Sequence, residues 1–127
     1  MVREYPTLEM DKERLKKRIE QFAHRCIKLS AALPRNYLGN HIRGQLIRCS
    51  TSAASNYRAA CIAQSKVGFI AKLGIVIEEV DESCFWMEFI IDEQLIPKTK
   101  VTPLLEEGQE LTAIFISSRK TARKNNQ

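Results

Sequence analysis

Apolar residues recur along the chain at spacings of three and four, the period expected for a helix that is buried on one side. In the first part of the chain the spacing is unbroken over Leu15, Ile19, Phe22, Cys26, Leu29 and Leu33. A strand would place every second residue on one face, so this pattern excludes β structure. With Asp11 as N-cap and Pro34 as a stop, it predicts a helix over residues 11–33.

A second helix is predicted over residues 37–63, with first turns weakened by Gly39 and Gly44. Its expected buried face comprises Leu38, Ile42, Gln45, Cys49, Ala53, Asn56, Ala60 and Ala63. This face includes two amides, Gln45 and Asn56. Because buried amides need partners, we expect both to hydrogen-bond across the bundle or to a neighbouring copy of the chain.

The remaining pattern predicts two more helices. One spans residues 66–95, is capped by Ser65, and buries Phe69, Leu73, Val76, Val80, Cys84, Met87 and Ile91. The other spans residues 103–120, with Thr102 as N-cap and Pro103 at the first helical position. Its inward residues are expected to be Leu104, Leu111, Phe115 and Ser118. Residues 121–127 are expected to form a flexible basic tail.

Four amphipathic helices with short connections predict an all-α fold, an up-down antiparallel four-helix bundle that forms one domain over residues 1–127. Tyr57, Trp86 and Phe89 exceed what one buried face requires. They predict a second apolar surface and therefore a homo-oligomer.

Composition narrows the class of protein. The chain has 127 residues, of which 44% are apolar and 28% charged, which suits a single globular domain. No long uncharged apolar run is present, and the start MVREYPTLEM lacks the apolar core of a signal peptide. We therefore expect a cytoplasmic protein with no membrane contact. The four cysteines form no C-x-x-C pair and are expected to be reduced core thiols.

The residues that usually mark catalysis or metal binding are sparse. Di-iron bundles need Glu-x-x-His pairs, but Gln21 precedes His24 and Leu38 precedes His41 at that spacing. No cofactor, metal or catalytic residue is therefore expected. The acids between residues 78 and 82 are interpreted as a solvated face, in which Glu78 or Glu82 pairs with Arg48 or Arg58.

Charge is distributed in blocks. The formal net charge is +5, and no Asp or Glu occurs between residues 21 and 77, whereas residues 78–110 are strongly acidic. Basic residues on the outer side of the first helix and at the C-terminus are the type that contacts phosphates. The candidate nucleic-acid-binding residues are Arg14, Lys17, Arg25, Lys28, Arg43, Arg58, Arg119, Lys120, Arg123 and Lys124. No base-reading motif accompanies them, so binding would be directed to the backbone.

Four segments carry a resemblance to a known family: LPRNYL, QLIRCSTSAASNYRAA, EEVDESCFWMEFI and LLEEGQELTAIF. Their order and spacing, over residues 15–120, resemble the four-helix-bundle proteins encoded by 23S rRNA intervening sequences. The same family includes the accessory variability proteins of diversity-generating retroelements. The resemblance implies a homopentameric barrel without known catalysis. For the retroelement branch it implies binding of RNA or DNA and of a reverse transcriptase.

The sequence therefore predicts a non-enzymatic homo-oligomer that binds nucleic acid, with structured RNA as the expected ligand. Two alternatives stay open. One is a scaffold that binds a protein, such as a reverse transcriptase, and has no nucleic-acid role. The other is an RNase resembling the HEPN family, whose Arg-polar-x₄-His pattern is matched by Arg35, Asn36 and His41 and more loosely by Arg18 and His24.

Overall fold

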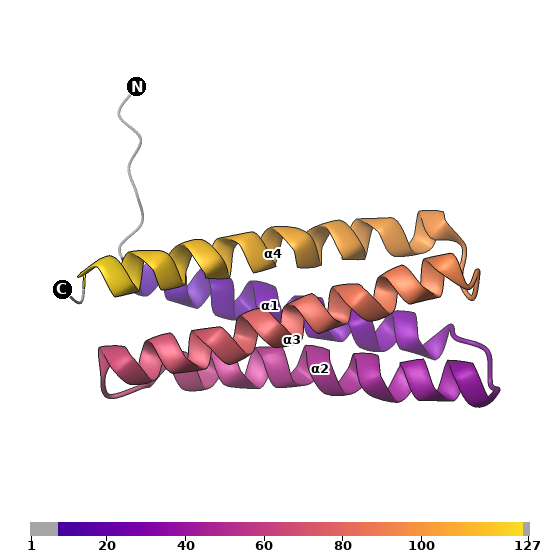
Figure 1. Ribbon diagram of the computed structural model, residues 1–127, viewed down its shortest axis with the longest axis horizontal. Coiled ribbons are helices and arrows are strands. Elements are labelled where there is room, and N and C mark those ends of the chain that lie inside the picture. Colours follow the sequence, from indigo (N-terminus) through magenta and orange to yellow (C-terminus); the bar gives the residue numbers. More distant parts are fainter. Residues whose placement is uncertain (1–7, 126–127) are drawn as a thin grey trace, which may run out of the picture.

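A computed structural model describes residues 8–125, with side-chain surroundings from residue 11 onward. This part of the chain forms α1 (Leu8–Ala31), α2 (Tyr37–Cys61), α3 (Lys66–Asp92) and α4 (Lys98–Asn125). Successive helices run antiparallel and lie side by side, so the described chain begins and ends at the same end of the bundle (Figure 1). The predicted all-α four-helix architecture is confirmed.

The turns between helices are closed by side-chain caps. Ser65 caps α3 as predicted, because its hydroxyl accepts a hydrogen bond from the Gly68 amide at 3.0 Å. Asn36 caps α2 in the same way, through the Gly39 amide at 2.8 Å. A Cβ at Gly39 would lie 1.9 Å from the Pro34 carbonyl oxygen, so this turn requires glycine. Gly39 is therefore a requirement of the turn as well as a weak helix former.

The predicted helix starts at Asp11 and Thr102 are wrong. The helix α1 already begins at Leu8, which places Asp11 inside it. The helix α4 begins at Lys98, and the Thr102 hydroxyl donates back to the Lys98 carbonyl at 2.9 Å. Pro103 thus lies within the helix. It is tolerated near the helix start because the fully buried Val101 anchors the preceding turn in the core.

The predicted helix ends also need correction. The helices α1 and α2 end two residues earlier than expected, and α3 ends at Asp92 instead of residue 95. After α3, Gln94 adopts a left-handed φ of 54° and the Leu95 amide bonds to the Ile90 carbonyl. This arrangement is a Schellman-type stop. Residues 121–125 are helical, not a flexible tail, because Ala122 is buried; residues 126–127 lie outside the described residues.

All four helices contribute to one core, and the predicted buried faces of α1, α3 and α4 are largely correct. The predicted face of α2 is only half correct. Ile42, Cys49, Ala53 and Ala60 are buried as predicted, whereas Leu38 is exposed and Gln45, Asn56 and Ala63 are partly buried. Leu46 and Tyr57 are buried instead. Tyr57 therefore does not belong to an outer apolar surface; it is 1% exposed and its ring lies 4.9 Å from that of Phe115.

The two amides of α2 do not cross the bundle. The Asn56 amide donates to the Ser52 carbonyl at 2.9 Å and to the Ser52 hydroxyl at 3.1 Å. The Gln45 carbonyl oxygen accepts from Arg48 Nε at 3.2 Å. Both sets of bonds stay within one helix because these side chains lie at the edge of the buried face, where the next turn is the nearest partner. The prediction of bonds across the bundle is therefore wrong.

Helices that are neighbours in the sequence pack along one another. The interface between α1 and α4 is the least extensive of those in the bundle. At one point α4 comes very close to the core: a Cβ at Gly108 would lie 2.6 Å from Cys84 Sγ and 3.1 Å from the Phe22 ring. None of the helices in the described chain combines the length and the apolar character needed to cross a bilayer.

Candidate nucleic-acid interface

The outer side of α1 carries the main group of predicted basic residues. Arg14, Lys17 and Lys28 are exposed and Arg25 is partly buried. Their spacing keeps them on the side of the helix opposite to its buried residues. Among residues 11–125, none of the four forms an ion pair with an acid. We call these four residues the α1 basic face.

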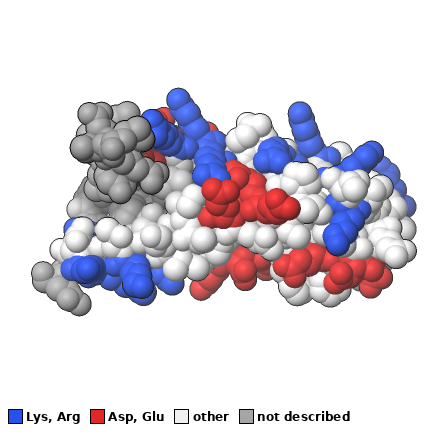
Figure 2. Space-filling model, turned by 90° about the horizontal axis from the view of Figure 1, so that it is seen from above, with Lys and Arg blue, Asp and Glu red and all other residues white. Residues whose placement is uncertain are grey.

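The charge of the whole surface follows the blocks of the sequence. Figure 2 shows positive side chains along one long edge, and negative side chains near the middle and along the opposite edge. A further positive group lies at the end that carries both termini. Negative side chains lie between the two positive regions in this view. The molecule therefore does not present one continuous positive surface.

Arg43 has a structural role. Its Nε donates to the Ser30 carbonyl at 3.1 Å, and its Nη2 donates to the Leu33 carbonyl at 2.8 Å. Ser30 lies in the last turn of α1 and Leu33 in the turn that follows, where the Leu33 amide also donates to the Ser30 carbonyl at 3.2 Å. Arg43 therefore caps the C-terminus of α1 from α2, and these donors are not free for a phosphate. The sequence offered no signal for this cap, since the partners are main-chain atoms.

The other predicted residues lie on other helices. Arg58 is exposed in the last turn of α2. In the last turns of α4, Arg119 is partly buried and its guanidinium lies beside Gly74 of α3. The exposed members of that group are Lys120, Arg123 and Lys124. The ten predicted residues are thus divided among three helices and do not form a single site.

An ion pair joins α1 to α4 near the basic face. Arg18 donates to both carboxylate oxygens of Glu107 at 2.8 Å, and Arg18 Nη2 lies 3.1 Å from Glu110 Oε1. The hydrogen bond from Arg18 holds the pKa of Glu107 below its usual range, and the same bond raises the pKa of Arg18. The sequence analysis did not single out this pair, because nothing in the pattern of either helix marks it.

A groove of about 1000 Å³ lies beside this ion pair, between α1 and α4. Lys12 and Arg14 of α1 and Lys66 at the start of α3 line it, together with Phe69. The Lys12 amine lies over the Phe69 ring, 4.7 Å from its centroid. The sequence analysis missed Lys12 and Lys66 as site residues because they are far apart in the chain and no motif links them.

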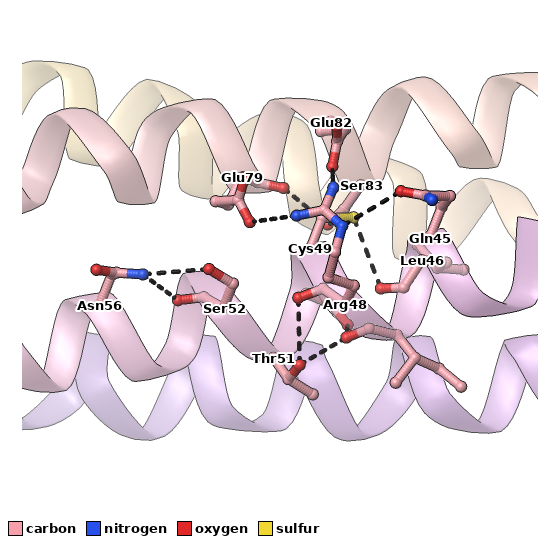
Figure 3. A network of polar contacts seen from close by, with 12 residues as sticks. Gln45, Leu46, Arg48, Cys49, Thr51, Ser52, Asn56, Glu79, Glu82 and Ser83 are labelled. Atoms are coloured by element: carbon pink, nitrogen blue, oxygen red, sulfur yellow. Dashed lines mark hydrogen bonds and ion pairs between the residues drawn. The ribbon is translucent and has the colours of Figure 1, made fainter.

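A polar network connects α2 to α3 (Figure 3). Arg48 of α2 pairs with Glu82 and, at 3.1 Å, with Glu79, so the predicted pair between Arg48 and Glu82 is confirmed. Beneath it, the Cys49 thiol lies 3.1 Å from the Ser83 hydroxyl. Burial raises the pKa of Cys49 to about 11, so this thiol is protonated at neutral pH and acts as a packing group.

An aromatic surface lies toward the end of α3. Phe85 and Phe89 are 48% and 40% exposed, and their rings are 5.0 Å apart. Trp86 is partly buried between them and α2, where its ring meets the ring of His41 edge-on at 5.5 Å. The second apolar surface predicted from Trp86 and Phe89 is therefore present. We call Phe85, Trp86 and Phe89 the aromatic surface.

The remaining chemical groups are dispersed. All four cysteines are free thiols; three are buried and Cys61 is partly exposed. Among the described residues, no three His, Cys, Asp or Glu side chains lie close enough together to bind a metal ion. Arg35 of the HEPN-like pattern is exposed in the turn between α1 and α2, whereas His41 lies against Trp86.

Comparisons with known proteins agree with this architecture. The model of the 23S rRNA-intervening sequence protein family matches residues 12–117. A crystal structure of a protein of unknown function, from the S23 ribosomal protein family of Bacteroides thetaiotaomicron, superposes with a TM-score of 0.77 at 28% identity. That match covers 84% of this chain and 98% of the other. A search of functionally curated proteins gives no significant match. Because the family model spans most of its length, this chain belongs to the 23S rRNA-intervening sequence protein family.

Proposed function

We propose that the protein is a non-enzymatic, homo-oligomeric binder of nucleic acid, and that its ligand is structured RNA. The observation that carries the proposal is the α1 basic face, none of whose four cations forms an ion pair with an acid among residues 11–125. A cation that is not held in an ion pair can contact a polyanion, and releasing counterions from that polyanion drives binding.

The length of the α1 basic face suits a phosphate backbone. Arg14 and Lys28 mark its ends, and at 1.5 Å per residue they lie about 21 Å apart along the helix. One strand of duplex DNA advances about 3.4 Å per nucleotide, so on that scale the basic face covers about six nucleotides. The resemblance to the retroelement branch of the family, which implies binding of RNA or DNA, makes RNA the first ligand to test.

The aromatic surface supports self-association. Two phenylalanine rings exposed next to a tryptophan form an apolar patch of the kind that a neighbouring subunit covers. It lies on α3, whereas the basic face lies on α1, so assembly through the aromatic surface would leave the basic face accessible. The resemblance to the family leads us to expect five copies.

The same patch also favours a second candidate function, a scaffold that binds another protein, such as a reverse transcriptase. The two functions differ in what the α1 basic face does. In the scaffold the basic face keeps the protein soluble, and reversing its charge changes neither assembly nor partner binding.

The decisive experiment is fluorescence anisotropy of a labelled RNA hairpin over a salt series. The test variant is Lys17→Glu/Arg25→Glu/Lys28→Glu on the basic face. The matched control is Arg35→Glu/Lys98→Glu/Lys100→Glu, which makes the same change in net charge at exposed sites outside α1. We expect the log–log salt slope to fall by about three in the test variant only, because each lysine or arginine that contacts a phosphate contributes about one.

Two results would contradict the proposal. Equal loss of affinity in both triple variants would show that net charge alone attracts RNA. Absence of RNA binding at low salt would leave the scaffold as the better function. Light scattering on the same samples reports the number of subunits, and a monomer at micromolar concentration would contradict the homo-oligomer.

A further inference from the structure

The groove between α1 and α4 lies at the end of the bundle where α2 turns into α3 (Figure 1). Its volume of about 1000 Å³ is at the upper end of the range of small-molecule sites, roughly 300–1000 Å³. It opens there because the interface between α1 and α4 is the least extensive of any neighbouring pair, and because α4 presents small side chains to the groove. These side chains are Ser117, Ser118, Thr121 and Ala122.

The rim of the groove is positively charged. Lys12 and Arg14 approach from α1 and Lys66 from α3, whereas Asp11 is the only acid among the described lining residues. Arg18 also lines the groove, but its guanidinium is held by Glu107 and Glu110. The free cations therefore favour an anionic ligand and disfavour a purely apolar one.

The floor of the groove offers an aromatic face. Phe69 is partly buried, and the Lys12 amine sits over its ring at 4.7 Å from the centroid. The Lys12 amine covers the ring face in this structure, so a base can stack on Phe69 only when the flexible Lys12 side chain moves from the ring to the phosphate. A nucleotide provides both groups, since its base stacks on an aromatic ring while its phosphate meets a cation.

The hydroxyls of α4 supply a second, independent observation. Some helical hydroxyls bond back to the preceding turn, as those of Thr102 and Thr112 do at 2.9 and 2.8 Å. The hydroxyls of Ser117, Ser118 and Thr121, which line the groove, form no such bond within the described part of the chain, and Ser117 and Thr121 are exposed. Their donors and acceptors are available for the edge of a base.

From this arrangement we infer that the groove binds one unstacked nucleotide of a single-stranded RNA segment, with its base against Phe69 and its phosphate at Lys12 and Lys66. The inference rests on the proposed RNA-binding function and deepens it. The α1 basic face, which shares Arg14 with the groove, carries the backbone toward it. The protein therefore prefers RNA with a single-stranded segment to fully paired RNA.

A second copy of the chain is a weaker choice of occupant. A groove with several cations at its rim suits an acidic partner segment, but the acids of this chain are spread over α1, α3 and α4, and Arg48 already holds Glu79 and Glu82 of the α3 group. An apolar partner helix would leave Lys12 and Lys66 buried without counterions, which is costly.

The test compares a single-stranded RNA of about eight nucleotides with a blunt duplex of the same sequence. Phe69→Leu removes the stacking face but keeps an apolar side chain, and Ser118→Leu narrows the groove without changing charge. Tyr37→Leu, at an exposed aromatic residue at the opposite end of the bundle, is the matched control. We expect each groove variant to weaken single-strand binding about tenfold and to leave duplex binding unchanged, with no effect of Tyr37→Leu on either probe.

The outcomes separate the two proposals. Unchanged single-strand affinity in both groove variants would overturn the groove and leave RNA binding by the α1 basic face intact. Loss of duplex and single-strand binding together in the groove variants would also overturn it, because the groove would then only support the fold. A change in subunit number in Phe69→Leu would show that a second copy occupies the groove. Wild-type protein that binds neither probe would overturn the proposed function itself, and the groove with it.

Discussion

The helix pairs α2–α3 and α1–α4 are bridged by similar ion pairs, but the two interfaces are packed differently. In each, an arginine bridges two glutamates three residues apart: Arg48 to Glu79 and Glu82, and Arg18 to Glu107 and Glu110. The pair α2–α3 also packs along its length, with the Cys49–Ser83 contact beneath its ion pair. The interface between α1 and α4 is much less extensive, and the two helices separate to form a groove.

This difference in packing shows that the contribution of an ion pair to stability depends on how closely the surrounding helices pack. The Arg48 side chain is 49% exposed above an apolar interface that is already closed, so water screens it and it adds little. Arg18 and Glu107 are 35% and 19% exposed, and their two parallel hydrogen bonds span a contact that few apolar residues close. We therefore expect α1–α4 to depend on its ion pair more than α2–α3 does.

The largest expected effect comes from disturbing the point where α4 comes closest to the core. Gly108→Val would drive side-chain atoms into Cys84 and Phe22, and overpacking of this kind costs about 3 kcal/mol of unfolding free energy. Chemical denaturation measures the loss. The matched control is Gly44→Val, where an added Cβ meets nothing within 4 Å, and we expect a change below about 0.5 kcal/mol. Equal losses in both variants would contradict the role of close packing.

The next effect separates the two ion pairs. Arg18→Met leaves the partly buried Glu107 without its hydrogen-bond donor, and we expect a loss of about 1 kcal/mol in unfolding free energy at neutral pH. Faster hydrogen exchange in α1 and α4 than in α2 and α3 would accompany it, because the loosened pair opens first. A variant as stable as the wild type would show that apolar contacts alone close α1 against α4.

The pH dependence of stability tests the contribution of the pair Arg18–Glu107. The hydrogen bond from Arg18 lowers the pKa of Glu107 in the folded protein. The ionised Glu107 therefore contributes fully to the free energy of unfolding above its unfolded pKa of about 4.3. This contribution is lost as the pH falls through the pKa of Glu107 in the folded protein. The stability difference between the wild type and Arg18→Met should therefore shrink below about pH 4. Urea unfolding at neutral and acidic pH measures it. A difference that stays constant would exclude this linkage.

The smallest effect is expected at the other arginine. Arg48→Met removes an ion pair whose arginine is half exposed and which spans an interface that apolar packing already closes, and we expect a change of at most about 0.5 kcal/mol. Thermal unfolding of both arginine variants under one set of conditions makes the comparison direct. If Arg48→Met destabilised the protein more than Arg18→Met, exposure would not be what sets the value of these pairs.

The sequence predicted the helices well where the period of apolar residues was strict. The six-residue pattern of α1 and the Ser65 cap of α3 are examples, because both depend on residues close together in the chain. It failed on α2, where polar and small residues blur the period and the buried face turns out to include Leu46 and Tyr57. It failed on the start of α4 because the burial of Val101 overrides the local preference of Pro103 to begin a helix.

The candidate site was predictable only in part. The exposed cations of α1 follow from helical spacing, since an outer face is fixed once the inner face is known. The role of Arg43 was not predictable, because its partners are the carbonyls that end another helix. The groove was not predictable either, since its lining comes from all four helices and the α2–α3 turn.

By itself, then, the sequence determined that the chain forms four helices and that its charges lie in blocks, because both depend on local spacing and composition. Only the tertiary structure decided which charges remain free. Packing ties Arg43 to the end of α1, Arg18 to α4 and Arg48 to α3, and leaves the α1 basic face without acidic partners among residues 11–125. The physical reason is that ion pairs and grooves form between side chains distant in sequence, whose distances are set by how the helices pack.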